Sequence, residues 1–152
     1  MTDWVEIIVR IGAAALAGCA LGLNRHLHHK ATGVRTLGLV ASGTAALVLA
    51  TLHGPDGGMH VEAMSRVVQG ILTGLGFIGA GVIIRDTTTE KVHGITTAAT
   101  VWATAIIGAL CGIGAWRVTL ALGCVVAAVL LIGGPIERWW QANFGSPEGP
   151  DK

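Results

Sequence analysis

Polar residues that could carry chemistry are few in this chain, and most stand at the edges of long apolar stretches. His26, His28 and His29 lie close together and could ligate a transition metal. No carboxylate or cysteine occurs within residues 24–35, which instead contain three basic residues. We therefore interpret residues 24–35 as a solvated basic loop suited to contact with anionic lipid headgroups, and we expect no metal site or cofactor.

A second polar group consists of Arg66, Gln69 and Thr73. Their spacing of i, i+3 and i+7 places all three on one face of a helix. Arginine and glutamine are costly at membrane depth unless they face the interior of the protein. We expect these three residues to form a polar site on the outer side of the membrane, facing the interior.

Enzymatic motifs are absent from the sequence. It has no phosphate-binding Walker loop, no nucleophile elbow and no HExxH zinc motif, and no clustered pair of acidic residues offers a hydrolytic site. The net charge is +1 with no basic stripe. These observations favour neither an enzyme nor a nucleic-acid-binding protein.

Five glycines punctuate the uncharged stretch between Arg66 and Arg85, namely Gly70, Gly74, Gly76, Gly79 and Gly81. Each costs about 1 kcal/mol relative to alanine in a helix in water, so an ordinary lipid anchor gives no reason for them. Gly70 and Gly74 form a pair that lets another backbone come close. The denser part from Gly76 to Gly81 could instead break the helix and expose carbonyl groups to a cavity. Both interpretations stay open, and close helix packing is favoured.

Composition identifies an integral membrane protein. Of the 152 residues, 52% are hydrophobic and 12% are charged, and the mean hydropathy is +0.66. The apolar residues form long blocks at 5–23, 36–52, 69–85, 94–115 and 118–136. We predict an all-α bundle of about five transmembrane helices over residues 1–141, embedded in the lipid bilayer. Residues 142–152, rich in glycine, proline and charge, are expected to form a disordered cytoplasmic tail.

Small residues recur at four-residue spacing on two of these blocks, which predicts faces for close helix packing. The first block carries Gly18 and Gly22. The fourth carries a line that runs through Thr96, Thr100, Thr104, Gly108 and Gly112. We predict that this line packs against the glycine-rich third block, because the two blocks are consecutive and a short loop joins them.

The basic residues predict the orientation. With the N-terminus outside, seven basic residues lie inside and three outside, which favours N-out and C-in. This topology brings three block ends together at the cytoplasmic face. The functional cluster expected there consists of Arg35, Thr36, Arg85, Asp86, Thr96 and Thr97. A helix cap by Thr96 or Thr97, and an ion pair of Asp86 with Arg35 or Arg85, are the structural alternatives.

Three pairs of polar-to-apolar junctions form an ordered set. They are 22–25 (Gly-Leu-Asn-Arg) with 33–36 (Gly-Val-Arg-Thr), 66–70 (Arg-Val-Val-Gln-Gly) with 76–83 (Gly-Phe-Ile-Gly-Ala-Gly-Val-Ile), and 94–100 (Gly-Ile-Thr-Thr-Ala-Ala-Thr) with Trp102. Together they resemble the membrane domain of the MgtC/SapB family over about residues 5–135. Two departures stand out. The family usually has acidic residues where this chain has Asn24 and His26, and its longer members carry a soluble C-terminal domain.

The resemblance implies a bacterial inner-membrane protein linked to growth at low magnesium and, in some pathogens, to survival inside host cells. It also suggests the F-type ATP synthase as a membrane partner, and a homo-oligomer is the other expectation. We expect a regulator that binds a partner through small-residue helix faces. The alternative is a transporter or channel for a cation such as Mg²⁺, but only Glu6 places a carboxylate in the apolar blocks.

Overall fold

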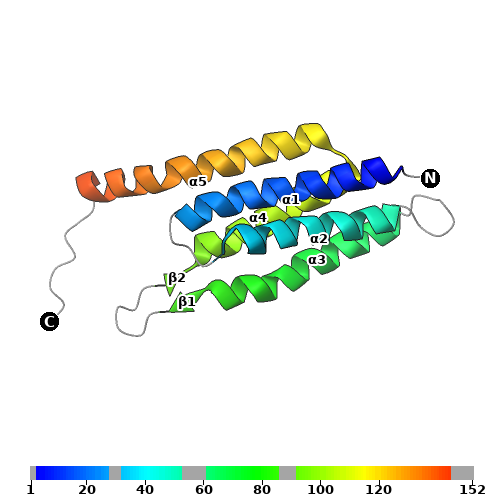
Figure 1. Ribbon diagram of the computed structural model, residues 1–152. Helices are drawn as coiled ribbons and strands as arrows, with labels where there is room; N and C mark the ends of the chain where they lie inside the picture. Colours follow the sequence, from blue (N-terminus) through cyan, green and yellow to red (C-terminus); the bar gives the residue numbers. More distant parts are fainter. Residues whose placement is uncertain (1–2, 28–31, 53–60, 86–91, 145–152) are drawn as a thin grey trace.

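The computed structural model describes residues 3–27, 32–52, 61–85 and 92–144. Five long helices cross the molecule side by side (Figure 1). They are α1 (Trp4–Leu27), α2 (Val34–Leu52), α3 (Val61–Val82), α4 (Ile95–Ile113) and α5 (Trp116–Phe144). Two short strands, β1 (Ile84–Arg85) and β2 (Val92–His93), pair antiparallel between α3 and α4.

All five helices are long and apolar enough to span a membrane. The predicted helical membrane fold is therefore confirmed. The glycine-rich segment is one continuous helix from Val61 to Val82. Its interpretation as a broken helix is wrong, because the helix runs through all five glycines without interruption. The predicted tail lies mostly outside the described residues, and α5 continues to Phe144.

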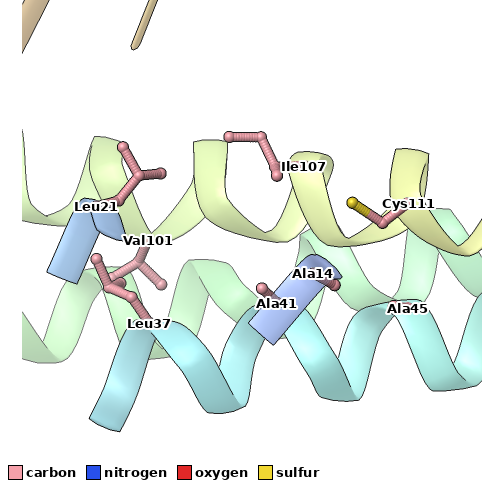
Figure 2. Packing of buried hydrophobic residues seen from close by; sticks show 8 residues of the cluster. All are labelled: Ala14, Leu21, Leu37, Ala41, Ala45, Val101, Ile107 and Cys111. Atoms are coloured by element: carbon pink, nitrogen blue, oxygen red, sulfur yellow. The ribbon is translucent and has the colours of Figure 1, made fainter. Parts of the chain in front are cut away.

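The core of the bundle is formed by α1, α2 and α4, which pack against one another. Figure 2 shows its buried side chains, which come only from these three helices. They are Ala14, Leu21, Leu37, Ala41, Ala45, Val101, Ile107 and Cys111. In Figure 1, α3 lies on one side of this core and α5 on the other. The helices α3 and α5 are therefore peripheral, and α5 contains no buried residue.

Glycines of α1 and α4 allow these helices to approach the backbone of α2 closely. A Cβ added at Gly18 would collide with the carbonyl oxygen of Leu37. One added at Gly108 would collide with the carbonyl oxygen of Ala41, and one added at Gly112 would lie 2.8 Å from that of Ala45. Small residues on both sides bring the backbones into contact, as is typical of helix packing in membranes.

The predicted packing of α4 against the glycine-rich helix is wrong for Gly108 and Gly112, which face α2. A Cβ added at Gly70, Gly74, Gly76 or Gly81 would meet no atom of the chain within 4 Å. Only Gly79 of this helix touches a neighbour, with Ala98 Cβ 3.5 Å from the added position. Like α3, α2 carries small side chains, at Ala41 and Ala45. Helix α4 makes its close backbone contacts with α2 through these alanines.

Replacing Gly108 by alanine should therefore destabilise the bundle, because its Cβ has to displace the backbone of α2. We expect a loss of about 1–3 kcal/mol, the usual cost of overpacking. The matched variant Gly74→Ala should not lower stability, since the added methyl group meets open space and alanine favours the helix more than glycine does. Thermal unfolding in mild detergent measures both. Equal melting temperatures for the two variants would contradict the α2–α4 packing.

Candidate functional site

The candidate site lies at the end of the bundle where α1 and α3 end and where α2 and α4 begin (Figure 1). The start of α2, the end of α3 and the start of α4 converge there as the sequence predicted, and the end of α1 joins them (Figure 1). The side chains of the predicted cluster do not all turn inward, however. Arg35, Thr36 and Thr96 are exposed, while Thr97 is buried. Asp86 lies outside the described residues. The backbone of Arg85 in β1 lies opposite Val92 of β2.

Arg25 is buried at this end of the bundle, although we predicted it to lie in a loop. Helix α1 continues to Leu27, so Arg25 is in its last turns, with only 4% of its surface exposed. Its Nη2 donates a hydrogen bond to Oγ1 of Thr97 in the first turn of α4. Its Nε is buried and has no partner in the structure.

A spacing signal in the sequence could have identified Arg25. It follows Gly18 by seven residues and Leu21 by four, so all three lie on one face of α1. Gly18 and Leu21 are both buried in the bundle. Extending the predicted helix by one turn beyond the apolar block would have placed Arg25 on this buried face.

A second buried polar atom without a partner belongs to Thr32, just before α2 begins. Its residue is 3% exposed and its Oγ1 has no hydrogen-bond partner in the structure. Gly22 holds this segment close to α1, because a Cβ there would lie 2.5 Å from Cα of Val34. Two unsatisfied buried polar atoms, on Arg25 and Thr32, thus occur at the same end of the bundle. Each costs free energy unless something bonds to it.

The electrostatics at this end are unfavourable for an isolated arginine. Helix α4 begins after Gly94, which adopts a left-handed conformation with φ 97°. Gly94 occupies the N-cap position and offers no side-chain hydrogen bond to the helix. The predicted caps by Thr96 and Thr97 are not formed by side-chain hydrogen bonds. The N-terminus of a helix carries partial positive charge, so it repels a cation. Within the described part of the chain, no carboxylate forms an ion pair with Arg25.

The opposite end of α4 shows the favourable arrangement. Arg10 donates from Nη1 to the carbonyl oxygen of Gly112 at 2.8 Å, where the helix C-terminus attracts a cation. Its Nη2 also pairs with Glu6, four residues earlier on α1. Arg10 is therefore bonded to a carboxylate and a carbonyl group, whereas the side-chain partner that the described residues give Arg25 is one hydroxyl group.

The predicted outer site is exposed rather than interior. Arg66, Gln69 and Thr73 are all exposed on α3; Arg66 and Gln69 lie in the half of the helix remote from Arg25, and Thr73 lies near its middle. Arg66 pairs with Glu62 at 3.0 Å, and both side chains are more than three-quarters exposed. The prediction that these residues face the protein interior is wrong for the single chain, because the buried side of α3 presents Gly79 to α4.

No group of three or more potential metal ligands occurs among the described residues. His28 and His29 lie outside them, so the structure does not test the histidine cluster.

Comparison with known proteins gives one family. The MgtC family model matches residues 11–139. Protein SrpB of Synechococcus elongatus is 40% identical over 126 residues, which cover 78% of this chain and 69% of SrpB. Protein MgtC of Salmonella typhimurium is 38% identical over 120 residues, covering 78% of this chain and 48% of that protein.

A further relative is the proposed magnesium transporter YhiD of Escherichia coli, 33% identical over 131 residues that cover 83% of this chain and 59% of YhiD. This chain thus spans about half the length of the Salmonella protein. No solved structure matches it significantly.

The bond between Arg25 and Thr97 can be tested by a matched pair of substitutions. Thr97→Val removes the hydroxyl group that accepts the hydrogen bond from Arg25. The buried guanidinium group then has no side-chain partner among the described residues. We expect this variant to lose about 1–3 kcal/mol of stability in detergent. Thr96→Val should be neutral, because the Thr96 side chain is exposed. The measurement is thermal unfolding, and equal stability of the two variants would show that the Arg25–Thr97 bond contributes nothing.

Proposed function

The chain belongs to the MgtC family, and we propose that it is a bacterial inner-membrane regulator that acts by binding another membrane protein. Its role would lie in growth under magnesium limitation and, in a pathogen, in intracellular survival or virulence. The observation that carries this proposal is the exposed face of α3.

Helix α3 presents glycines to the outside of the single chain. Around Gly70, Gly74, Gly76 and Gly81 there is open space where a side chain would begin. In a bilayer these glycines give α3 neither helix propensity nor packing area. Gly70, Gly74 and Gly81 share one side of α3, and they become favourable when a second helix lies across that side, since the backbones can then approach closely.

Polar groups share this exposed face. At 100° per residue, Arg66, Thr73 and Phe77 lie within about 40° of one another around α3, and Gly70, Gly74 and Gly81 follow within about a further 60° on one side of them. Phe77 is 85% exposed. A polar face turned toward lipid is costly, so covering Arg66 and Thr73 with a partner helix stabilises the complex. The exposed polar and glycine residues therefore support the same interaction surface, which we call the α3 face.

The family resemblance suggests the F-type ATP synthase as the partner, and a second copy of this chain could use the same α3 face. We further propose the N-out, C-in orientation. The structure places the beginning of α1 and the end of α5 at opposite ends of the bundle, as an odd number of spans requires (Figure 1). In this orientation the Arg25 end faces the cytoplasm, where most of the basic residues then lie.

Cation transport is the second candidate, supported by the name of YhiD. Magnesium binds to carboxylate groups and water oxygens. In the described helices Glu6 pairs with Arg10 and Glu62 pairs with Arg66, and Glu137 is exposed. No buried carboxylate is thus available among the described residues to line a pathway. For this reason we rank regulation above transport.

The proposal is tested by complementation of growth in low-magnesium medium, in a strain that lacks its own family member. Gly74→Leu and Gly81→Leu should abolish growth, because leucine on the α3 face keeps a partner helix at a distance. Gly43→Leu is the matched control, since Gly43 is an exposed glycine of α2 with open space beside it. It should support normal growth.

Immunoblots of the membrane fraction must show equal amounts of the three variants. Normal growth of both α3 variants at these levels would contradict a regulatory role of the α3 face.

A further inference from the structure

We propose that this protein binds a phospholipid on the side of the bundle opposite the α3 face. Its phosphate group would be held by Arg25 at the N-terminus of α4, and one acyl chain would lie in an apolar groove between α1, α4 and α5. Two independent observations support this inference. One is a buried cation that no carboxylate of the described residues neutralises, and the other is the shape and chemistry of the groove.

The first observation is the charge at Arg25. Its side chain is almost fully buried and is directed to the first turn of α4 by its bond to Thr97. Both the guanidinium group and the helix N-terminus are positive there, and helix N-termini bind phosphate groups. Nε of Arg25 and Oγ1 of Thr32 are buried donors without partners in the structure. A phosphate group is an acceptor for both kinds of donor and neutralises the positive charge.

The second observation is a groove with a volume of about 390 Å³ along α5. Its lining includes Leu21 and Asn24 of α1, Ile107 of α4, and Thr119, Ala127 and Leu131 of α5. Between Thr119 and Leu131 it extends for about 18 Å at 1.5 Å per residue. This length is close to half of the roughly 30 Å thickness of the hydrocarbon core, which one acyl chain fills.

The groove and the cation are adjacent on α1. Leu21 and Asn24 line one end of the groove, and Arg25 lies one turn beyond Leu21 on the same face. Arg25 is also the last residue of the apolar span Trp4–Arg25. Lipid phosphates occupy this depth at the edge of the hydrocarbon core, so a lipid with its chain in the groove presents its phosphate at Arg25. A phospholipid therefore accounts for both features, whereas a free phosphate ion accounts for one.

The test uses the full chain, purified and delipidated in detergent, with three additives measured by thermal unfolding. Dioleoyl phosphatidylglycerol carries both phosphate and acyl chains, dioleoylglycerol carries chains alone, and inorganic phosphate carries the anion alone. We expect only phosphatidylglycerol to raise the melting temperature. Arg25→Met should weaken this effect at least about tenfold in lipid concentration, because it removes a charge-assisted hydrogen bond.

The same variant, Arg25→Met, should not lose stability when lipid is absent, in contrast to its weaker response to lipid. Arg25→Met roughly keeps the length of the side chain but removes a buried charge that has no carboxylate partner among the described residues. In lipid-free detergent it should be as stable as the parent chain or more stable. A clear loss of stability there would show that a carboxylate of the chain itself, such as Asp86 or Glu90, already neutralises Arg25, and it would overturn the proposal.

The groove is tested by adjacent alanines of α5. Ala127 lines the groove, whereas Ala128 is exposed and does not line it. Ala127→Phe should displace the acyl chain and abolish the stabilisation by phosphatidylglycerol, and Ala128→Phe should retain it. Equal responses of the two variants, or an equal rise in melting temperature with inorganic phosphate, would overturn the assignment of a lipid to this groove.

Discussion

The close approach of α4 to the backbone of α2 is the constraint on which the rest of the structure depends. Gly108 and Gly112 lie against the carbonyl groups of Ala41 and Ala45, where no side chain fits. Lipid chains are as apolar as leucine, so hydrophobicity does not drive helices together within a bilayer. Backbone contact between small residues supplies the attraction instead. Since α1 uses Gly18 in the same way against α2, these three helices form the core.

This core determines what its two peripheral helices can do. Helix α3 contacts the core on one side and leaves its glycine-rich face exposed, while α5 lies on the other side beside an apolar groove (Figure 1). Helix α4 has an arginine of α1 at each end. Arg10 lies at the negative end with a carboxylate partner, and Arg25 lies at the positive end with one hydroxyl group. The buried Nε of Arg25, which has no partner in the structure, and the exposed faces of α3 and α5 are the features on which the two proposed interactions rest.

Much of this architecture could be predicted from the sequence, because apolar blocks of spanning length and small-residue spacing are local signals. The four-residue spacing of Glu6 and Arg10 is likewise a local signal for the ion pair that the structure contains. The pairing of faces was not predictable, since Gly74 and Gly108 have the same spacing pattern and only the three-dimensional packing distinguishes them. Arg25 was missed because a charged residue after an apolar block indicates a loop, whereas α1 continues for another turn.

The central claim is that the α3 face is vacant in the single chain and covered by another protein in the membrane. Photo-crosslinking in living cells tests it most directly, with a photoreactive amino acid in place of Phe77 on α3 or of Leu120 on α5. Both positions are well exposed in the structure, at 85% and 69%. We predict a discrete protein adduct from position 77 and none from position 120. Absence of a protein adduct at position 77, or the same adducts at both positions, would contradict the account.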